Sequence, residues 1–341
     1  MLATPLSFAV VVCTYDFKHL NDLHAAVNSI RRQFYPGHVA IVICVDGNDE
    51  LYQSLSQKYA DKQVKVTTTG KAKPAGLARA RNVAIHHCTE DVISFLDDDA
   101  AADQNWIANI AESFRKYECV TVAGKTLPTW QANPPRWLTP TFYWLVGATG
   151  TAEKDYEHFI RSGYGSNMSC MRNALLQVGM FNPSFGMRGS SLLQAEEADL
   201  GLRINEAFDK ETTYNPKAII FHKVDLEKLR LSYMFRRAYY QGKSKALLFN
   251  LHGRDRSILV AESNYLRLVS YEPIGALEDL FNGGSILSLV ERLLFSLSVT
   301  FSVMLGFIVN FSTGSARQLK GRMWEPLRNS QEERLSEVTA R

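Results

Sequence analysis

Apolar and polar positions alternate in blocks along the first third of the chain. Short continuous apolar runs there have the length and composition of strands that are buried on both faces. They lie at residues 7–13, 39–46, 64–69 and 91–97. More polar stretches with apolar residues at helical spacing separate them, at 21–33, 50–60, 75–88 and 103–117. Strands that alternate with helices predict βαβ units and a mainly parallel sheet.

An irregular stretch follows at residues 126–165. It has no strand or helix period, and Trp130, Trp137 and Trp144 lie among its prolines. A long connection of this kind is usually functional or mobile. Its aromatic rings either stack on sugar rings or simply close the domain, and the sequence leaves both interpretations open.

The rest of the chain has two more strands and then becomes mostly helical after His222. The strands are predicted at 166–171 and 212–222, with a helix at 195–208 between them. We therefore predict three parts. They are an α/β domain at 1–224 with halves at about 1–125 and 126–224, a basic helical extension at 225–280, and an apolar segment with a polar tail at 281–341.

The C-terminal parts have an unusual distribution of charge. Residues 293–315 carry no charged side chain and are long enough to span a bilayer, although Ser, Thr and Asn interrupt them. We expect a helix that lies in the membrane interface or re-enters it. A membrane span and a buried helix are the alternatives, and both are less favoured. Residues 223–256 hold nine Lys/Arg against three Asp/Glu. This excess suits a pyrophosphate or an anionic membrane surface, or it is a solvated helix face.

Bulk composition limits the classes of protein that remain. A hydrophobic fraction of 46% and a charged fraction of 21% indicate a globular chain and exclude a disordered one. The five cysteines are scattered without a C-x-x-C pair, which favours a reducing compartment and neither disulfides nor zinc. The N-terminal apolar run lacks a basic flank and reads as a first strand, so we expect a cytoplasmic protein. A glycine-rich dinucleotide loop and a P-loop are both absent from the sequence.

Acidic residues collect where the predicted strands end. Asp97, Asp98 and Asp99 follow the apolar run at 91–97 directly. Residues two apart in extended chain share a face, so Asp97 and Asp99 lie on one side and Asp98 faces away. Two carboxylates at the carboxyl edge of a parallel sheet suit Mg²⁺ or Mn²⁺ bound together with phosphates. The plainer interpretation is a solvated turn, or an N-cap for the helix that begins near Asp103.

Two further groups have a structural and a chemical interpretation. Glu196, Glu197 and Asp199 begin the helix at 195–208, where acidic side chains offset the helix dipole. Alternatively, one carboxylate is a general base, and Asp199 or Glu196 binds an acceptor hydroxyl. His222 ends an apolar strand, and it is either a packed histidine or a metal ligand.

Six motifs in this order resemble family 2 of the glycosyltransferases, inverting enzymes with the GT-A fold. The resemblance extends from about Ser7 to Val224. Its motifs are VVVCTYDF, VICVDGND, GLARARNVAI, FLDDDA, GSNMSCMRNALLQVGMF and EEADLGLRI. Glu197 stands where the family usually has an aspartate, so Glu196 is retained as the second candidate base. The implied fold is a Rossmann-like α/β sheet of the nucleotide-diphospho-sugar transferase type, with a helical C-terminal extension.

The resemblance implies a role for each candidate residue. Glu197, or else Glu196, is the catalytic base, and Asp99 with His222 holds Mn²⁺ or Mg²⁺. Asp199 and Asn167 contact the acceptor. The donor-binding residues are Thr14, Tyr15, Asp46, Arg81 and Asp97. Asp98 is expected to be the least essential of the three aspartates, and Arg236, Arg237 and Lys243 are candidates to contact a diphosphate or an acceptor phosphate.

The implied activity is transfer of a sugar from a UDP- or GDP-sugar to a saccharide or lipid-linked acceptor, in cell-envelope or lipid-linked glycan synthesis. An anionic membrane surface is the expected partner, and nucleic acid is not. We expect a peripheral or monotopic protein at the inner face of the cell membrane. The alternative is a non-catalytic nucleotide- or carbohydrate-binding protein on the same fold. A phosphatase-type aspartate nucleophile is disfavoured, because FLDDDA falls on the fourth strand.

Overall fold

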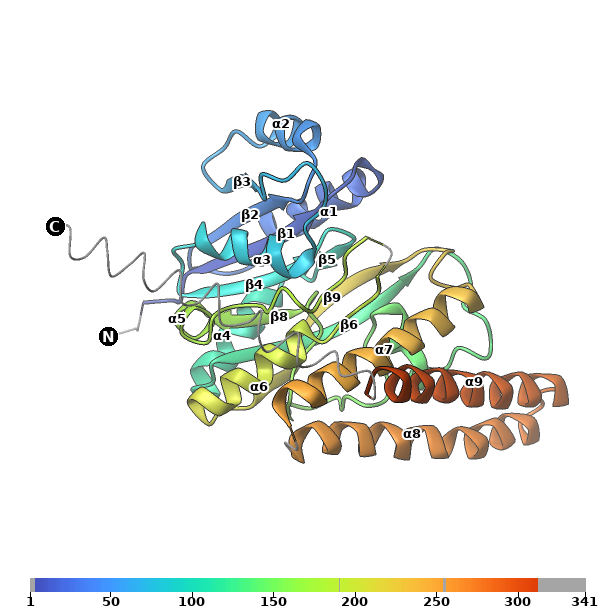
Figure 1. Ribbon diagram of the computed structural model, residues 1–341. Helices are drawn as coiled ribbons and strands as arrows, with labels where there is room; N and C mark the ends of the chain where they lie inside the picture. The colour runs from blue at the N-terminus through green and yellow to red at the C-terminus, as the bar shows by residue number, and fades with distance from the viewer. Residues whose placement is uncertain (1–3, 190, 254–255, 312–341) are drawn as a thin grey trace.

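Four parallel strands form one half of the sheet in the computed structural model, which describes residues 4–189, 191–253 and 256–311. They are β1 (Phe8–Thr14), β2 (Val39–Val45), β3 (Val64–Thr68) and β4 (Val92–Asp97), in the spatial order β3-β2-β1-β4. The connecting helices are α1 (Leu20–Arg31), α2 (Asp49–Lys58) and α3 (Leu77–His86). The predicted alternation of strands and helices is confirmed over this half (Figure 1).

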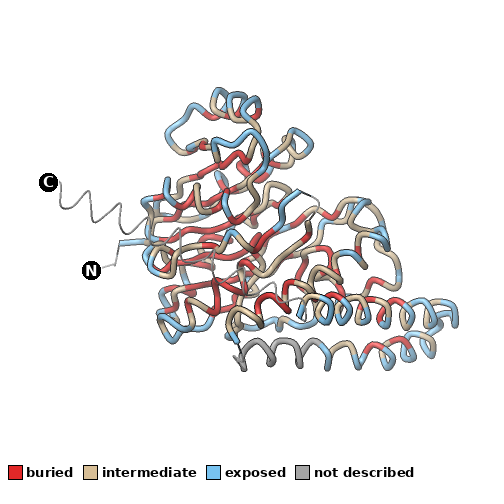
Figure 2. The backbone as a smooth tube through the Cα atoms, viewed as in Figure 1, coloured by how far each residue is buried: buried red, intermediate tan, exposed pale blue. Residues whose placement is uncertain are grey.

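Helices cover both faces of this sheet, and β1 shows why its sequence is apolar throughout. Phe8, Val10 and Val12 pack in the core beneath α1, α2 and α4 (Trp106–Tyr117). Ala9 and Val11 belong to a second core on the other face, beneath α3 and α6 (Glu196–Phe208). Buried residues accordingly concentrate along the central strands (Figure 2). A strand with two buried faces leaves polar residues only at its ends.

The second half of the sheet has mixed pairing. It contains β5 (Ala100–Ala102), β6 (Thr121–Trp130), β7 (His158–Ile160), β8 (Met168–Met171) and β9 (Thr212–Val224). Strand β8 joins the halves by antiparallel pairing with β4 and β6, β6 runs parallel to β9, and β5 and β7 pair antiparallel with β9. The short helices η1 (Phe17–His19), η2 (Pro140–Val146) and α5 (Arg172–Gln177) lie in the connections. The structure differs from the predicted pattern in the three-residue strand β5 and in the stretch predicted as irregular, where the end of β6, η2 and β7 lie.

The C-terminal part is helical, as predicted. It consists of α7 (Leu231–His252), α8 (Arg256–Phe281) and α9 (Ile286–Phe311). Helix α9 packs closely along α7, because a β-carbon on Gly242 would lie 1.9 Å from the Val303 carbonyl oxygen. Gly306 is equally tight, since its β-carbon would lie 2.0 Å from the Tyr239 carbonyl oxygen. The two glycines therefore permit a helix contact that any side chain would prevent.

A buried ion pair fastens α8 and α9 to the rest of the molecule. Arg292 donates to Glu272 at 3.1 Å, and Glu272 also accepts a 2.9 Å hydrogen bond from Thr139, which precedes η2. Arg292 directly precedes the uncharged stretch at 293–315. In the structure α9 begins at Ile286, so Arg292 lies within the helix and faces α8. Residues 312–341, which include the end of the predicted segment and the polar tail, lie outside the described residues.

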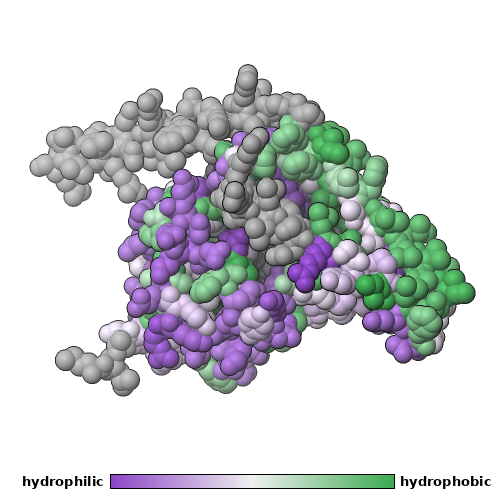
Figure 3. All heavy atoms as spheres, turned by 90° about the horizontal axis from the view of Figure 1, so that it is seen from below, coloured by the Kyte–Doolittle hydropathy of each residue, from purple (hydrophilic) through white to green (hydrophobic). Residues whose placement is uncertain are grey.

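Helix α9 presents a long apolar face. Among the described helices, α9 alone has the length and hydropathy needed to cross a membrane. Over its most apolar 18 residues the mean hydropathy is 2.0, and 22% of this stretch is buried. Most of its exposed apolar side chains follow one another at spacings of three or four residues. We call this set the α9 face, and it comprises Leu287, Val290, Leu294, Leu297, Phe301, Met304, Leu305 and Ile308. Figure 3 shows apolar surface gathered on the α8–α9 side of the molecule, beside a mainly hydrophilic α/β body.

Candidate active site

A cavity of about 1140 Å³ opens at the carboxyl ends of β1, β2 and β4. Parallel α/β sheets place ligands at this edge, because the connecting loops diverge there. Most of the residues singled out from the sequence line this cavity. They are Thr14, Tyr15, Asp46, Arg81, Asp97, Asp99, Glu196, Glu197 and His222.

An acidic and imidazole cluster lies on the side of the cavity formed by β4 and β9. Asp97, Asp99 and His222 each offer one ligand atom, and these atoms lie within 4.8 Å of one another. Strand β5 creates this arrangement, because it pairs Ala100 with His222 and thereby brings His222 beside Asp99. The His222 Nε2 atom lies 3.3 Å from the Asp99 Oδ1 atom.

The cluster has the composition of a divalent-cation site. Two carboxylates and one imidazole suit Mn²⁺ or Mg²⁺, and substrate phosphates commonly complete such a site. The Nδ1 atom of His222 is buried without a hydrogen-bond partner among the described residues. Burial by itself would raise the pKa of Asp99. His222 and Lys228 outweigh this effect and hold the pKa well below its usual range. A carboxylate that stays ionised is the form that binds a metal.

Lys228 is a site residue that the sequence analysis did not single out. Its Nζ atom donates to Asp99 at 3.0 Å and lies 3.3 Å from His222 Nε2. Burial lowers the pKa of Lys228, but the charge of Asp99 outweighs burial, and the pKa lies above its ordinary value. Lys228 belongs to the basic stretch at 223–256, yet nothing in the sequence distinguishes it from the other lysines there.

A buried arginine joins the two acidic groups of the cavity. Arg81 on α3 is 3% exposed, and its guanidinium lies 3.4 Å from Asp97, 3.4 Å from Glu196 and 3.3 Å from Glu197. Burial lowers the pKa of Arg81, but the three carboxylates outweigh it and keep the group charged. The sequence analysis assigned Arg81 to the donor. In the structure its guanidinium faces the carboxylates of this chain, which are its closest ionic contacts.

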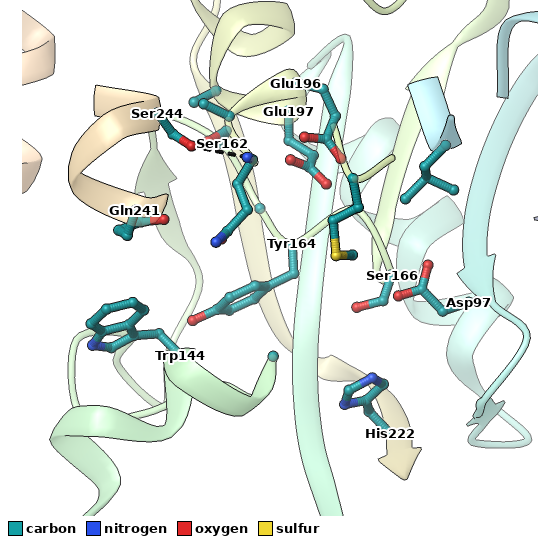
Figure 4. Close-up of a pocket in the computed structure, with 18 of the residues that line it drawn as sticks. Asp97, Trp144, Ser162, Tyr164, Ser166, Glu196, Glu197, His222, Gln241 and Ser244 are labelled. Carbon is teal, nitrogen blue, oxygen red and sulfur yellow. Dashed lines mark hydrogen bonds between the residues drawn. The ribbon is translucent and has the colours of Figure 1, made fainter. Parts of the chain in front are cut away.

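The first turn of α6 presents two glutamates that differ in exposure. The side chain of Glu197 is 18% exposed, against 4% for Glu196. Burial first, and the charge of Glu197 second, raise the pKa of Glu196 to about 8, so that it is largely protonated at neutral pH. Figure 4 shows both side chains entering the cavity near Asp97 and Ser166. Glu197 is therefore the more accessible of the two candidate bases.

The backbone around these glutamates is specialised. Ala195, just before Glu196, has φ of 82°, in the left-handed region that side chains other than glycine seldom adopt. Gly165 passes so close that a β-carbon there would lie 2.0 Å from Glu197 Oε1 and 2.6 Å from Arg81. Both features bring main chain against the carboxylates, and both depend on tertiary contacts that the sequence does not show.

The side of the cavity that was predicted to bind the donor has its own hydrogen bonds. Asp46 accepts from the Ala75 and Gly76 backbone N–H groups at 2.9 and 2.8 Å, and from the Thr69 hydroxyl at 2.9 Å. Thr14 is buried, whereas Tyr15 is 52% exposed. Asp46 therefore fastens the loop before α3 to the end of β2 while it lines the cavity.

Asp98 does not face away from the cavity, contrary to the prediction. The strand geometry behind that prediction stops at Asp97, and the chain turns before β5. Asp98 therefore lines the cavity together with its two neighbours. Burial, reinforced by the charge of Asp99, raises the pKa of Asp98 to about 8.

Two residues assigned to the acceptor lie outside the cavity lining. Asp199 is fully buried and accepts from Arg203 at 2.7 Å and from His252 at 2.8 Å, which ties α6 to the end of α7. Asn167 accepts from the Trp106 indole N–H at 2.8 Å, and its amide donates to two backbone carbonyls. The polar groups of both side chains are engaged inside the protein, so the geometry does not support an acceptor contact for either.

The three tryptophans of the long connection all pack against one hydrophobic core, and one of them also lines the cavity. Trp130 and Trp137 pack against the hydrophobic core beneath α7 and α9. Trp144, at the end of η2, lines the cavity together with Tyr164. Figure 4 shows Trp144 on the wall opposite Asp97, with Tyr164 between them. The sequence pattern alone does not separate Trp144 from the other two tryptophans.

Solved structures share this architecture. A mannosyltransferase, PcManGT from Pyrobaculum calidifontis, solved with GDP-Man and Mn²⁺, matches with a TM-score of 0.58 and 17% identity. The match covers 91% of this chain and 87% of that chain. GalNAc-T7, solved with UDP, GalNAc and Mn²⁺, matches with a TM-score of 0.50 and 15% identity over 73% of this chain and 51% of its own. The chain therefore has the GT-A glycosyltransferase fold, as predicted.

The sequence family is equally clear. The family model described as "Glycosyl transferase family 2" matches residues 9–179, half of the chain, and the chain belongs to that family. A glucosyl-dolichyl phosphate glucuronosyltransferase of Haloferax volcanii is 28% identical over 309 residues, which cover 90% of this chain and 97% of that protein. The succinoglycan biosynthesis protein ExoM of Rhizobium meliloti is 24% identical over 182 residues, 53% of each chain. The predicted family is thereby confirmed.

Proposed function

We propose that this protein is an inverting glycosyltransferase that moves a sugar from a nucleoside-diphosphate sugar to a hydroxyl of a lipid-linked acceptor. One observation carries the proposal. A cluster with the composition of a divalent-cation site and the accessible Glu197 lie in one cavity, and the buried Arg81 contacts both. Transfer needs these two parts, because a diphosphate must leave while a hydroxyl loses its proton.

The leaving-group side of the reaction lies at Asp97, Asp99 and His222. These residues would hold Mn²⁺ or Mg²⁺, which when bound supplies positive charge to the departing diphosphate. The Lys228 ammonium, 3.0 Å from Asp99, adds a cation of the protein at the same place. Asp46, Thr14 and Tyr15 lie near the ends of β1 and β2, where the nucleoside would bind.

The acceptor side of the reaction lies at Glu197. Its carboxylate takes the proton of the acceptor hydroxyl as the oxygen attacks the anomeric carbon from the face opposite the diphosphate. The new glycosidic bond forms while the bond to the diphosphate breaks, and the anomeric configuration inverts. The proton remains on Glu197 until solvent removes it. Arg81 acts as a positioning residue, because its guanidinium holds Glu197 near Asp97.

The acceptor class rests on two further observations. The relative in Haloferax volcanii is a glucosyl-dolichyl phosphate glucuronosyltransferase by name, and this chain covers 97% of its length. The α9 face is an exposed apolar stripe on a helix that the structure fastens to the catalytic domain. We infer that α9 lies in the membrane interface at the cytoplasmic face and that the acceptor is a lipid-linked sugar.

A transfer assay tests this function. UDP- and GDP-sugars are first screened with Mn²⁺ for thermal stabilisation, because a bound ligand raises the unfolding temperature. The donor found in this way is incubated with a glycosylated polyprenyl phosphate. We expect release of the nucleoside diphosphate and transfer of the sugar, both abolished by EDTA. A protein that binds the donor but transfers its sugar to no lipid-linked acceptor would be a nucleotide-sugar-binding protein instead.

A further inference from the structure

One face of α7 forms the cavity wall on the acceptor side. Its cavity-lining residues recur at helical spacing, and they are Tyr233, Arg237, Gln241, Ser244, Lys245 and Leu248. Figure 4 shows Gln241 and Ser244 on the wall opposite Asp97 and near Trp144. Arg237, Gln241 and Lys245 are four residues apart, so successive members lie about 6 Å apart along the helix axis. An amide side chain is thus flanked by a cation one turn before it and another one turn after it.

Two of the Lys/Arg side chains on α7 line the cavity, and two others on the same helix do not. Arg237 lines it, whereas the preceding Arg236 is exposed and is not part of the lining. Lys245 lines it, whereas Lys243, on the same helix, does not. Arg161, from the segment between β7 and β8, lines the same cavity. The positive charge therefore faces into the cavity at specific positions and is not only a solvated helix face.

The two α7 cations have the environment of groups that receive an anion. Arg237 has its Nε atom buried without a hydrogen-bond partner among the described residues, and its guanidinium contacts the Met187 sulfur at 3.7 Å. It forms no ion pair with a described acidic side chain. Burial first, and the charge of Arg161 second, lower the pKa of Lys245 to about 7. An anion bound here would offset the free energy needed to bury these charges.

We propose that Arg237 and Lys245 bind the phosphate of the lipid-linked acceptor, with the phosphate lying over Gln241. This inference rests on the proposed function, because it assigns a subsite to the acceptor of that reaction. The diphosphate of the donor is expected elsewhere, at the Asp97–Asp99–His222 cluster on the opposite wall. An acceptor phosphate on α7 leaves the glycan to reach toward Glu197.

The location of the wall also fits a lipid. Helix α7 has α9 packed closely along it through Gly242 and Gly306. Val303 of α9 reaches the cavity lining, and the α9 face lies on the outer side of the same helix. A phosphate on α7 therefore lies one helix away from the surface that we assign to the membrane. The acceptor would be held with its charged group in the cavity and its hydrocarbon chain along α9.

Matched substitutions test the phosphate subsite. Arg237→Gln and Lys245→Gln remove a cation that lines the cavity, and Arg236→Gln and Lys243→Gln remove the same charge from positions outside the lining. The acceptor KM is measured in detergent micelles at saturating donor and Mn²⁺. One acceptor carries the phosphodiester of a polyprenyl phosphate sugar, and the other is a neutral alkyl glycoside of the same sugar.

For the phosphorylated acceptor, we expect the KM to rise roughly 10-fold to 100-fold in Arg237→Gln and Lys245→Gln, because each loses a charged hydrogen bond. The neutral acceptor, the donor Kd and the two control variants should be unaffected. Lys245→Arg, which keeps the charge, should retain most of the affinity, and thermal unfolding confirms that each variant is folded.

Three results with the variants would overturn the subsite. They are an equal loss on both acceptors, a weaker donor Kd in place of a higher acceptor KM, or an equal loss in the control variants. The second of these would assign the cations to the donor diphosphate or to an acidic donor sugar. Failure of the proposed function looks different, because the wild-type protein would then transfer to neither acceptor. A wild type that uses both acceptors equally well would contradict the phosphate subsite alone.

Discussion

Replacing Arg81 by methionine should destabilise the protein strongly, and the loss should depend on pH. The substitution keeps an unbranched side chain but removes the cation that Asp97, Glu196 and Glu197 share. Removing one partner of a buried ion pair typically costs about 3–5 kcal/mol. Asp97 and Glu197 retain 32% and 18% side-chain exposure, and Glu196, at 4%, is largely protonated at neutral pH, so we expect a loss near the lower end, about 3 kcal/mol.

The pH dependence follows from the charges left behind. Burial already raises the pKa of Asp97 and of Glu196, and the loss of Arg81, whose charge lowers both, raises them further above their values in the unfolded chain. The folded variant then binds more protons than the unfolded chain, and its stability falls as pH rises. The difference between the variant and the wild type should therefore be smaller at pH 5 than at pH 8.

Urea unfolding followed by circular dichroism measures both effects. Arg79→Met is the matched control, because Arg79 is exposed on the same helix. That control should stay within about 0.5 kcal/mol of the wild type. The reasoning would be refuted if Arg81→Met were as stable as Arg79→Met, or if its loss were the same at both pH values.

Three other predictions concern the metal, Glu196 and the membrane. His222→Ala should weaken Mn²⁺ binding by at least roughly 10-fold, since even outer-shell partners of metal ligands commonly contribute that much. Electron paramagnetic resonance with UDP or GDP present measures this binding, and unchanged binding would exclude His222 as a ligand. Glu196 has a pKa of about 8 in the folded protein against 4.5 unperturbed, so it should make the wild type less stable as pH rises from 5 to 8. Glu196→Gln should reduce that slope in urea unfolding, and an identical slope would contradict the assignment. Leu297→Glu with Phe301→Glu should reduce co-sedimentation with anionic vesicles by at least about 10-fold, because both side chains would leave the interface; undiminished binding would place the membrane contact elsewhere.

The parts of the site that lie at strand ends could be predicted from the sequence. Strands such as Phe8–Thr14 are apolar throughout because both faces are buried, and a parallel sheet brings their carboxyl ends to one edge. This reasoning predicts Asp97 and Asp99 at the cavity from the sequence alone, and the family resemblance adds Asp46. The succession of motifs was sufficient to predict the family.

Other parts of the site depend on pairings between distant segments. Strand β5 is three alanines without a distinctive pattern, yet its pairing with β9 brings His222 beside Asp99. Asn167 directly precedes strand β8, and its amide side chain is of a type that could contact a ligand. In the structure, however, that amide is hydrogen-bonded to Trp106 and to two backbone carbonyls. Arg236 and Arg237 are indistinguishable in sequence, and only the rotation of α7 decides which one faces the cavity.

Transfer by Glu197→Gln tests the central claim of this account most directly. The sugar transfer rate is measured in a single turnover, with saturating donor, Mn²⁺ and lipid-linked acceptor, and the donor Kd is measured in parallel. We predict that the rate falls by about 10²–10⁴ while the donor Kd stays unchanged, because the amide cannot accept the proton of the acceptor. A rate close to that of the wild type would contradict the assignment of Glu197 as the base.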